Sequence, residues 1–329
     1  MLAAGFGWTL HAGGLPLLPT RERLGRIGWG PVAIYAGWFS LLWVVRAHRW
    51  TYLLRPLAKV PRRDVLAIGL TGAAAIVLAP LRLGELARPY LIAGRGVTFA
   101  QALGTVGAER IVDGIVLALM LTGGLLFAVP LSPLPDHLGD LPLPVAAIPR
   151  AAWLSLAIFG AAALAMVGFY FARAPAERLT ASVVGAVSPR AAAALGRTVA
   201  RVAEGLSFLP RPRDALPFVR DTLVYWGMNV TGILFLLRAA GFQASLAQAT
   251  VLLGVISLGL LMPSGPGFFG AFQLSAYCGL ALYFSLDQVV QEGAAFVFAL
   301  YVLQTSVAVS FGVLGLSLMP ARKPPPIPN

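Results

Sequence analysis

Two long stretches without a charged residue constrain this chain more than any other feature. No charge occurs between Asp113 and Asp136, and none occurs between Arg238 and Asp287. A helix needs about 20 apolar residues to cross the hydrocarbon core of a bilayer. Only 12% of the residues are charged and 58% are apolar, whereas soluble domains are about 25% charged. The sequence therefore predicts an all-α, polytopic integral membrane protein built as a helical bundle.

Arginine supplies nearly all of the positive charge. The chain has 23 arginines beside only two lysines, Lys59 and Lys323, and its net charge is +12. In a soluble protein this balance would suggest nucleic-acid binding. Here the arginines cluster between apolar spans, where such residues orient a membrane protein and contact anionic inner-leaflet lipids. We therefore expect no nucleic-acid partner.

The sequence offers no pattern for a metal or a cofactor. Cys278 is the single cysteine, and the histidines His11, His48 and His137 are far apart. Metal sites and disulfides need clustered or paired ligands. The nucleotide-binding pattern Gly-x-x-x-x-Gly-Lys-Ser/Thr does not occur. We therefore expect no cofactor, and any energy source would be a gradient, a partner or mass action.

The basic loops set the expected orientation, because cytoplasmic loops of membrane proteins are rich in arginine and lysine. Loop 46–63 and region 173–220 are strongly basic and are predicted to be cytoplasmic, as is the C-terminus. Loop 131–149 has no Lys or Arg and is predicted to lie outside. The candidate apolar segments are 28–45, 64–81, 103–130, 151–172, 221–240, 247–262, 267–286 and 292–318.

The domain organisation follows from these segments. Residues 1–27 form an apolar or interfacial N-terminal segment, 28–318 the transmembrane domain and 319–329 a disordered cytoplasmic tail. Region 173–220 is predicted to be a cytoplasmic insert, whose helix begins at Ser188-Pro189. Arginines on one face of that helix favour binding to the anionic inner surface of the membrane.

The charge rule conflicts with a simple count of spans, and two re-entrant hairpins would resolve the conflict. Segment 64–81 would enter the membrane from the cytoplasm and return, turning near Pro80. A second hairpin over 247–286 would enter from outside and turn at residues 263–267. Broken segments in opposite orientations are typical of inverted repeats in transporters. The alternative is that both are ordinary kinked spans and that one loop breaks the charge rule.

The first charged motif falls in the predicted first hairpin. Arg82, Glu85 and Arg88 are spaced three residues apart, which places them on one helical face. If Glu85 pairs with one of the two arginines, one net positive charge is left. A guanidinium group that is partly shielded from water is well suited to binding a phosphate group. The alternative is that the three side chains lie at the membrane interface and extend toward water.

The second charged motif is Glu109-Arg110-x-x-Asp113. If its helix begins near Thr98, Asp113 lies inside the hydrocarbon region, because the following uncharged run fills the outer part of the span. The two carboxylates share a face and Arg110 can reach Asp113. An ion network that extends to Arg82 and Arg88 is favoured over proton transfer.

The third motif is free of charge and rich in glycine and proline. Its glycines permit close backbone approach and free amides that can bind an anion or line a path. Gln273 and the mid-span Asn229 are polar candidates for a cavity, although such residues often hold helices together instead. The residues of the motif are Pro263, Ser264, Gly265, Pro266, Gly267 and Gly270.

Together, these three motifs resemble the signature blocks of the flippase-like transmembrane family that includes the membrane region of bacterial lysylphosphatidylglycerol synthases. The resemblance covers residues 30–318 and implies a lipid translocase-like fold with re-entrant helices. The aminoacyl-transfer domain of the full synthases is not in this sequence, so lipid synthesis is not implied. Phe268 stands where the family often has glycine and Gln273 where an acid is common, and both leave the lipid identity open.

The expected function is translocation of a lipid with an anionic or glycosylated headgroup across the bacterial cytoplasmic membrane. Arg82 and Arg88 would bind the headgroup, and the carboxylates of Glu85, Glu109 and Asp113 would set the charge of the cavity. One alternative is a non-transporting subunit that recruits a lipid synthase or glycosyltransferase. The other is an intramembrane enzyme that uses the two carboxylates of the second motif, although those spans lack a nucleophile–base pair.

Overall fold

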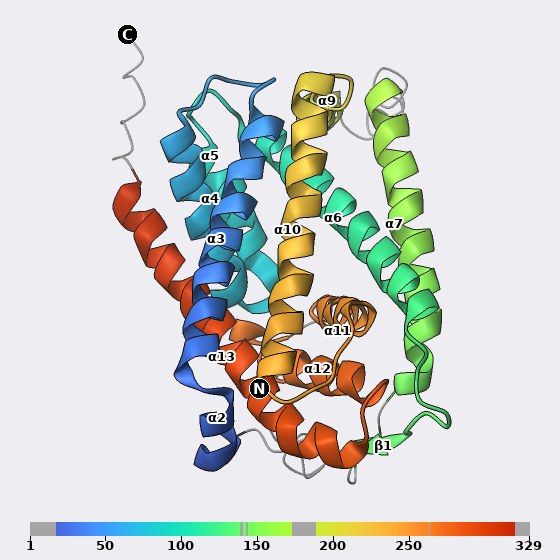
Figure 1. The fold of residues 1–329 in the computed structure, drawn as a ribbon. Helices are drawn as coiled ribbons and strands as arrows, with labels where there is room; N and C mark the ends of the chain where they lie inside the picture. The colour runs from blue at the N-terminus through green and yellow to red at the C-terminus, as the bar shows by residue number, and fades with distance from the viewer. Residues whose placement is uncertain (1–17, 139–140, 143, 173–188, 263, 320–329) are drawn as a thin grey trace.

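The computed structural model describes residues 18–138, 141–142, 144–172, 189–262 and 264–319, and the side chains of 80–82, 138, 141–142 and 189–194 are not described. The fold is an all-α bundle, as predicted (Figure 1). Among the described residues, five helices are long and apolar enough to cross a membrane. They are α3 (Trp29–Leu54), α6 (Phe99–Phe127), α7 (Ile148–Phe171, preceded by the short helix η2, Val145–Ala147), α10 (Pro212–Ala239) and α13 (Leu286–Leu318).

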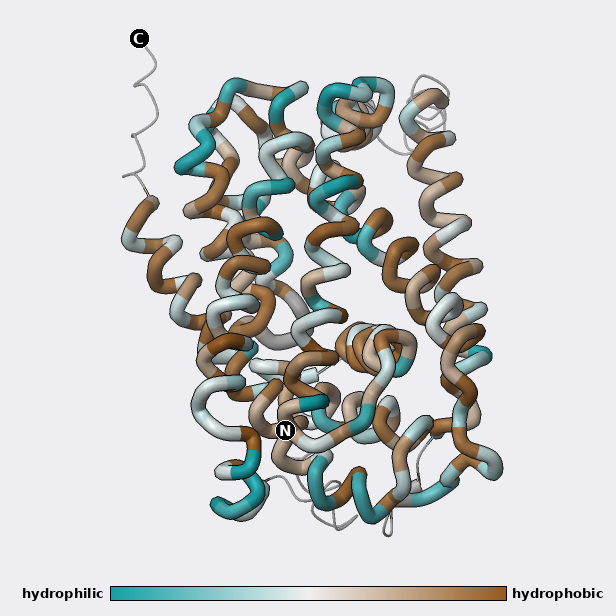
Figure 2. Tube along the Cα trace, in the orientation of Figure 1, coloured by the Kyte–Doolittle hydropathy of each residue, from teal (hydrophilic) through white to brown (hydrophobic). Residues whose placement is uncertain are grey.

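Figure 2 shows where hydrophobic and hydrophilic residues lie along these helices. Hydrophobic residues predominate along the helices, and hydrophilic residues gather at both ends of the bundle. Hydrophilic residues also occur within the bundle, among α3, α6 and α10. Because polar groups are costly in lipid, that interior cluster is the first candidate for a functional site.

Two helices extend nine residues beyond their predicted bounds. α3 continues to Leu54, so Arg46 and Arg49 lie within a helix, and their assignment to a loop over 46–63 is wrong. α10 begins at Pro212, nine residues before the predicted span 221–240. In both cases a run of charged residues was taken as the end of a span. Arg49 of α3 and Asp214 and Asp221 of α10 are buried against other helices, whereas Arg213 and Arg220 are exposed.

A helical hairpin, here called the first fold-back, comprises α4 (Arg62–Leu78), η1 (Pro80–Leu86) and α5 (Ala87–Ile92). The chain turns at Ala79-Pro80, as predicted, and returns alongside α4. An Asp64–Arg95 ion pair of 2.6 Å joins its two ends. A Cβ atom added to Gly84 would collide with the backbone of Ala75, so the two arms are in close contact.

The second fold-back comprises α11 (Leu246–Gly259), η3 (Pro266–Phe268) and α12 (Ala271–Ala281). Gly279 packs against Leu252, and Gly259 packs against Ser275, so α12 returns alongside α11. In Figure 1, α11 is seen nearly end-on and α12 lies across the view. The second fold-back therefore runs across the bundle, whereas α3, α7 and α10 run along it.

The remaining elements lie at the ends of the bundle. The loop after α3, the amphipathic helix α9 (Pro189–Glu204) and the end of α13 lie at one end (Figure 1). The strands β1 (His137–Leu138) and β2 (Leu141–Pro142) and the loop before α11 lie at the other. α9 begins at Pro189, as predicted, and Ser188 is outside the described residues. The short helix α2 (Arg21–Ile27) precedes α3, and residues 1–17 and 320–329 are likewise outside.

Candidate functional site

A fully buried arginine, Arg49, organises the polar interior of the bundle. It lies on the face of α3 that also carries Tyr35, Phe39 and Leu42, all of them buried. Its two terminal nitrogens donate to the two oxygens of Asp113, each at 2.6 Å, and one of them donates to Glu109 at 3.0 Å. This bidentate geometry matches the planar fork of guanidinium to carboxylate. Arg49 thus ties α3 to α6.

Glu109 and Asp113 come from α6, where their spacing of four residues places both on one face. The helix begins as the sequence predicts, with Thr98 as N-cap and a reciprocal hydrogen bond between the Thr98 backbone and Gln101. Glu109 is completely buried. Because a buried carboxylate is costly without partners, the arginines around it determine whether this helix can pack here.

Two further arginines complete the arginine–carboxylate network, which consists of Arg49, Arg88, Glu109, Arg110 and Asp113. Arg88, from α5 of the first fold-back, donates to Glu109 at 2.7 and 3.3 Å. Arg110 donates to Glu109 at 2.8 Å and lies 3.6 Å from Asp113. The predicted ion network is confirmed for Arg88, Glu109, Arg110 and Asp113, whereas Arg49 was not predicted and the side chain of Arg82 is outside the described part of the chain. The network joins α3, α6 and the first fold-back.

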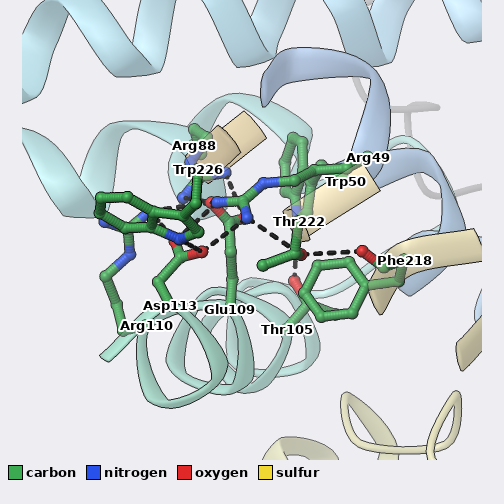
Figure 3. A network of polar contacts seen from close by, with 10 residues as sticks. All are labelled: Arg49, Trp50, Arg88, Thr105, Glu109, Arg110, Asp113, Phe218, Thr222 and Trp226. Atoms are coloured by element: carbon green, nitrogen blue, oxygen red, sulfur yellow. Dashed lines mark hydrogen bonds and ion pairs between the residues drawn. The ribbon is translucent and has the colours of Figure 1, made fainter. Parts of the chain in front are cut away.

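Neutral side chains around the network add further hydrogen bonds (Figure 3), and the buried Nε atoms of Arg49, Arg88 and Arg110 have no hydrogen-bond partner among the described residues. Thr222 of α10 accepts from Arg49 at 3.1 Å, and the Trp226 indole donates to Asp113 at 3.2 Å. On the other side, the Trp50 indole donates to Thr105 at 3.0 Å and its ring lies 5.2 Å from the Arg88 guanidinium carbon. These contacts bring α10 into the same cluster.

The network carries one excess positive charge, because three arginines face two carboxylates. Breaking one partner of a buried ion pair typically costs about 3–5 kcal/mol, because the other charge remains buried and uncompensated. The network is therefore well suited to holding four segments in register. Both carboxylates are held by arginines, which is poor chemistry for a general base.

A cavity of about 600 Å³, here called the central cavity, opens beside the network. Charged side chains line one part of it: Arg46, Glu85, Arg110 and Asp113. Asn229, Ser257, Gln304 and Thr305 add neutral polar groups, and most of the remaining wall is apolar. The second fold-back contributes Leu253, Ile256, Gly267, Phe268 and Phe272. The cavity therefore combines a charged part with an apolar wall.

The structure divides the predicted site residues into separate groups. Glu85, Arg110, Asp113, Asn229 and Gly267 line the central cavity. Arg88 and Glu109 are buried in the network behind it. Gln273 accepts a hydrogen bond from the Gly270 amide at 2.7 Å and lines a separate apolar pocket. Ser264 and Gly265 are buried and Pro266 is exposed, whereas Pro263 and the side chain of Arg82 are outside the described part of the chain.

Sequence reasoning missed Arg46, Arg49 and the aromatic residues Trp43, Tyr225 and Trp226. A signal for the two arginines was present, because Tyr35, Phe39, Leu42, Arg46 and Arg49 recur at alternating spacings of four and three residues. That spacing continues a single helical face. Charge ended the predicted span at residue 45, although the periodicity continued through the arginines.

Comparison with protein families shows a match to the family described as the lysylphosphatidylglycerol synthase TM region, over residues 1–310. The match includes the five long helices except for the last turns of α13, both fold-backs and the network. Comparison with curated proteins and with solved structures gave no match.

Proposed function

The chain belongs to the lysylphosphatidylglycerol synthase TM region family, and on that premise we propose that it translocates a lipid between the leaflets of a bacterial cytoplasmic membrane. Membership makes it an integral membrane protein related to lipid-modifying systems. We propose three further points: that a lipid is moved, which class of lipid it is, and that the C-terminus is cytoplasmic.

The central cavity is the observation that carries the proposal. Its volume of about 600 Å³ is typical of small-molecule sites, which range from about 300 to 1,000 Å³. A lipid headgroup needs polar partners inside the membrane, and its chains need apolar contacts. Arg110 and Asn229 offer the former, and Leu253, Ile256 and Phe272 offer the latter. Both kinds of surface meet in one chamber.

The two fold-backs support the same function. The first returns toward the end of the bundle where it began, and the second, which begins nearer the opposite end, runs across the bundle (Figure 1). We propose that they are re-entrant elements in inverted orientation. Non-helical backbone such as η3 is tolerated at membrane depth where protein or a water-filled chamber surrounds it. Gly267 and Phe268 of η3 line the central cavity.

Filling the cavity tests the proposal. Protein reconstituted in vesicles should move fluorescent phospholipid or glycolipid between leaflets, and Ser257→Trp should slow this at least tenfold because the indole occupies the chamber. Leu246→Trp is the matched control, since Leu246 lies on the same helix and is 55% exposed. Failure of the wild-type protein to move any lipid of a broad panel would contradict the proposal.

A second candidate is a membrane subunit of a lipid-modifying or glycosyltransferase system. The family's description as the membrane region of a synthase favours it. In that case a synthase or glycosyltransferase should co-purify, and its activity should survive Ser257→Trp. An intramembrane enzyme is less favoured, because arginines occupy both Glu109 and Asp113.

A further inference from the structure

Arg46 is a cation of the central cavity that the network does not use. It lies on α3 one turn before Arg49, is partly buried and lines the cavity. Its guanidinium carbon lies 5.8 Å from the centre of the Trp43 ring and 6.0 Å from that of Tyr225. Aromatic faces attract cations at this range. The two rings, from α3 and α10, therefore hold the charge at the cavity wall.

Arg46 and Arg49 differ in their partners although they lie on one face of one helix. Arg49 is fully buried and bonds to two carboxylates. Within the described residues, Arg46 takes part in no hydrogen bond or ion pair. Its guanidinium group contacts the faces of the two aromatic rings. Stacking on ring faces leaves the five N–H donors at the edge of the guanidinium available.

The charge of the surroundings indicates what those donors would bind. The described charged groups of the network and cavity are four arginines, at 46, 49, 88 and 110, and three carboxylates, at 85, 109 and 113. Among these described side chains, the positive charges exceed the negative charges by one. A ligand with one negative charge would balance this excess, a neutral ligand would leave it uncompensated, and a pyrophosphate would reverse the excess.

We propose that Arg46 selects the headgroup and that the cavity takes a lipid with a single phosphodiester charge. The inference rests on the proposed function, because it assumes that a lipid headgroup enters the cavity. A phosphodiester presents two oxygens to the planar guanidinium fork, which a neutral sugar headgroup does not. Arg88, bonded to Glu109, is not available for this role.

The test compares Arg46→Gln with wild type in vesicles that contain fluorescent phosphatidylglycerol or a fluorescent neutral glycolipid. Wild type should move phosphatidylglycerol faster than the glycolipid. Arg46→Gln should slow phosphatidylglycerol roughly 10- to 100-fold, the range for a lost hydrogen bond to a charged group, and should remove the preference. Arg46→Lys should keep part of it, because it retains the charge without the fork.

Arg63→Gln is the control, since Arg63 is exposed in the first turn of α4 and does not line the cavity. Unchanged headgroup preference in a folded Arg46→Gln protein would overturn the inference. If wild type moves no lipid, thermal shifts separate the two proposals. If phosphatidylglycerol raises the melting temperature of the wild-type protein but not that of Arg46→Gln, Arg46 remains the binding residue. If it raises both melting temperatures equally, the inference about Arg46 is overturned. Equal stabilisation by soluble glycerophosphoglycerol and by the lipid would point to a free-anion site and overturn the lipid assignment.

Discussion

The two fold-backs have a similar outline but are held by different forces. The first is tied to α6 by charge, because Arg88 of α5 bonds to the buried Glu109. The second contains no charged residue and packs through glycines, with Gly254 against Leu121 of α6 and Gly279 against Leu252. In lipid the hydrophobic effect does not drive helices together, so close packing of small residues replaces it.

The two fold-backs also differ in backbone conformation. The turn of the first fold-back, at Ala79-Pro80, lies in ordinary extended and helical regions. In the second, Phe268 has φ 55° and lies between Gly267 at 74° and Gly270 at 89°. A non-glycine residue in the left-handed region costs about 1–3 kcal/mol and often marks a functional position. We infer that the first fold-back is the fixed wall of the cavity and the second the adaptable one.

Topology labelling gives the largest expected effect, since it is all or none. Single cysteines at Lys59 and Phe99, which flank the first fold-back, should react with an impermeant maleimide from one membrane face. Cysteines at Gln243 and Asp287, which flank the second, should react from the other face together with His137. The native Cys278 is buried. Labelling of residues 59 and 99 from opposite faces would make the first fold-back an ordinary span.

Glu109→Gln should destabilise the protein by about 3–5 kcal/mol, because it leaves buried arginines without their carboxylate. Thermal unfolding in detergent, followed by size-exclusion chromatography, measures the loss. Asp64→Asn, which breaks the more exposed pair with Arg95, should cost no more than about 1 kcal/mol. Similar losses for the two variants would show that charge does not anchor the first fold-back as we infer.

Gly84→Ala should cost about 1–3 kcal/mol, because the new methyl group meets the backbone of Ala75 and must separate the two arms. Gly259→Ala in the second fold-back should cost less, since the new methyl group meets the hydroxyl and Cβ of the Ser275 side chain and no backbone atom at less than 3 Å. Gly107→Ala, with open space around it, is the control. A larger loss at Gly259 than at Gly84 would reverse our ranking of rigid and adaptable walls.

Much of this architecture was accessible from sequence because the lipid environment imposes strong rules. The uncharged runs marked α6 and the second fold-back, and the arginine distribution favoured two hairpins over ordinary kinked spans. Thr98 marked the start of α6, and the spacing of Glu109 and Asp113 placed them together. Pro80 marked the turn of the first fold-back.

Which arginine pairs with which carboxylate was beyond the sequence, because those contacts join residues far apart in the chain. Arg49 and Asp113 are 64 positions apart, and Trp226 reaches Asp113 across 113 positions. Local pattern assigned Arg49 to a loop and Arg88 to a ligand. Packing instead buries both, and it leaves Arg46 facing the cavity.

The sequence alone determined that this chain is an integral membrane protein, because its long apolar runs are stable only in a lipid bilayer. Tertiary structure alone decided which of its charges are neutralised inside the bundle and which remains at the cavity wall. The reason is physical: hydropathy sums over neighbouring residues, whereas a buried charge is stabilised only by the partner that the fold places within a few ångströms of it.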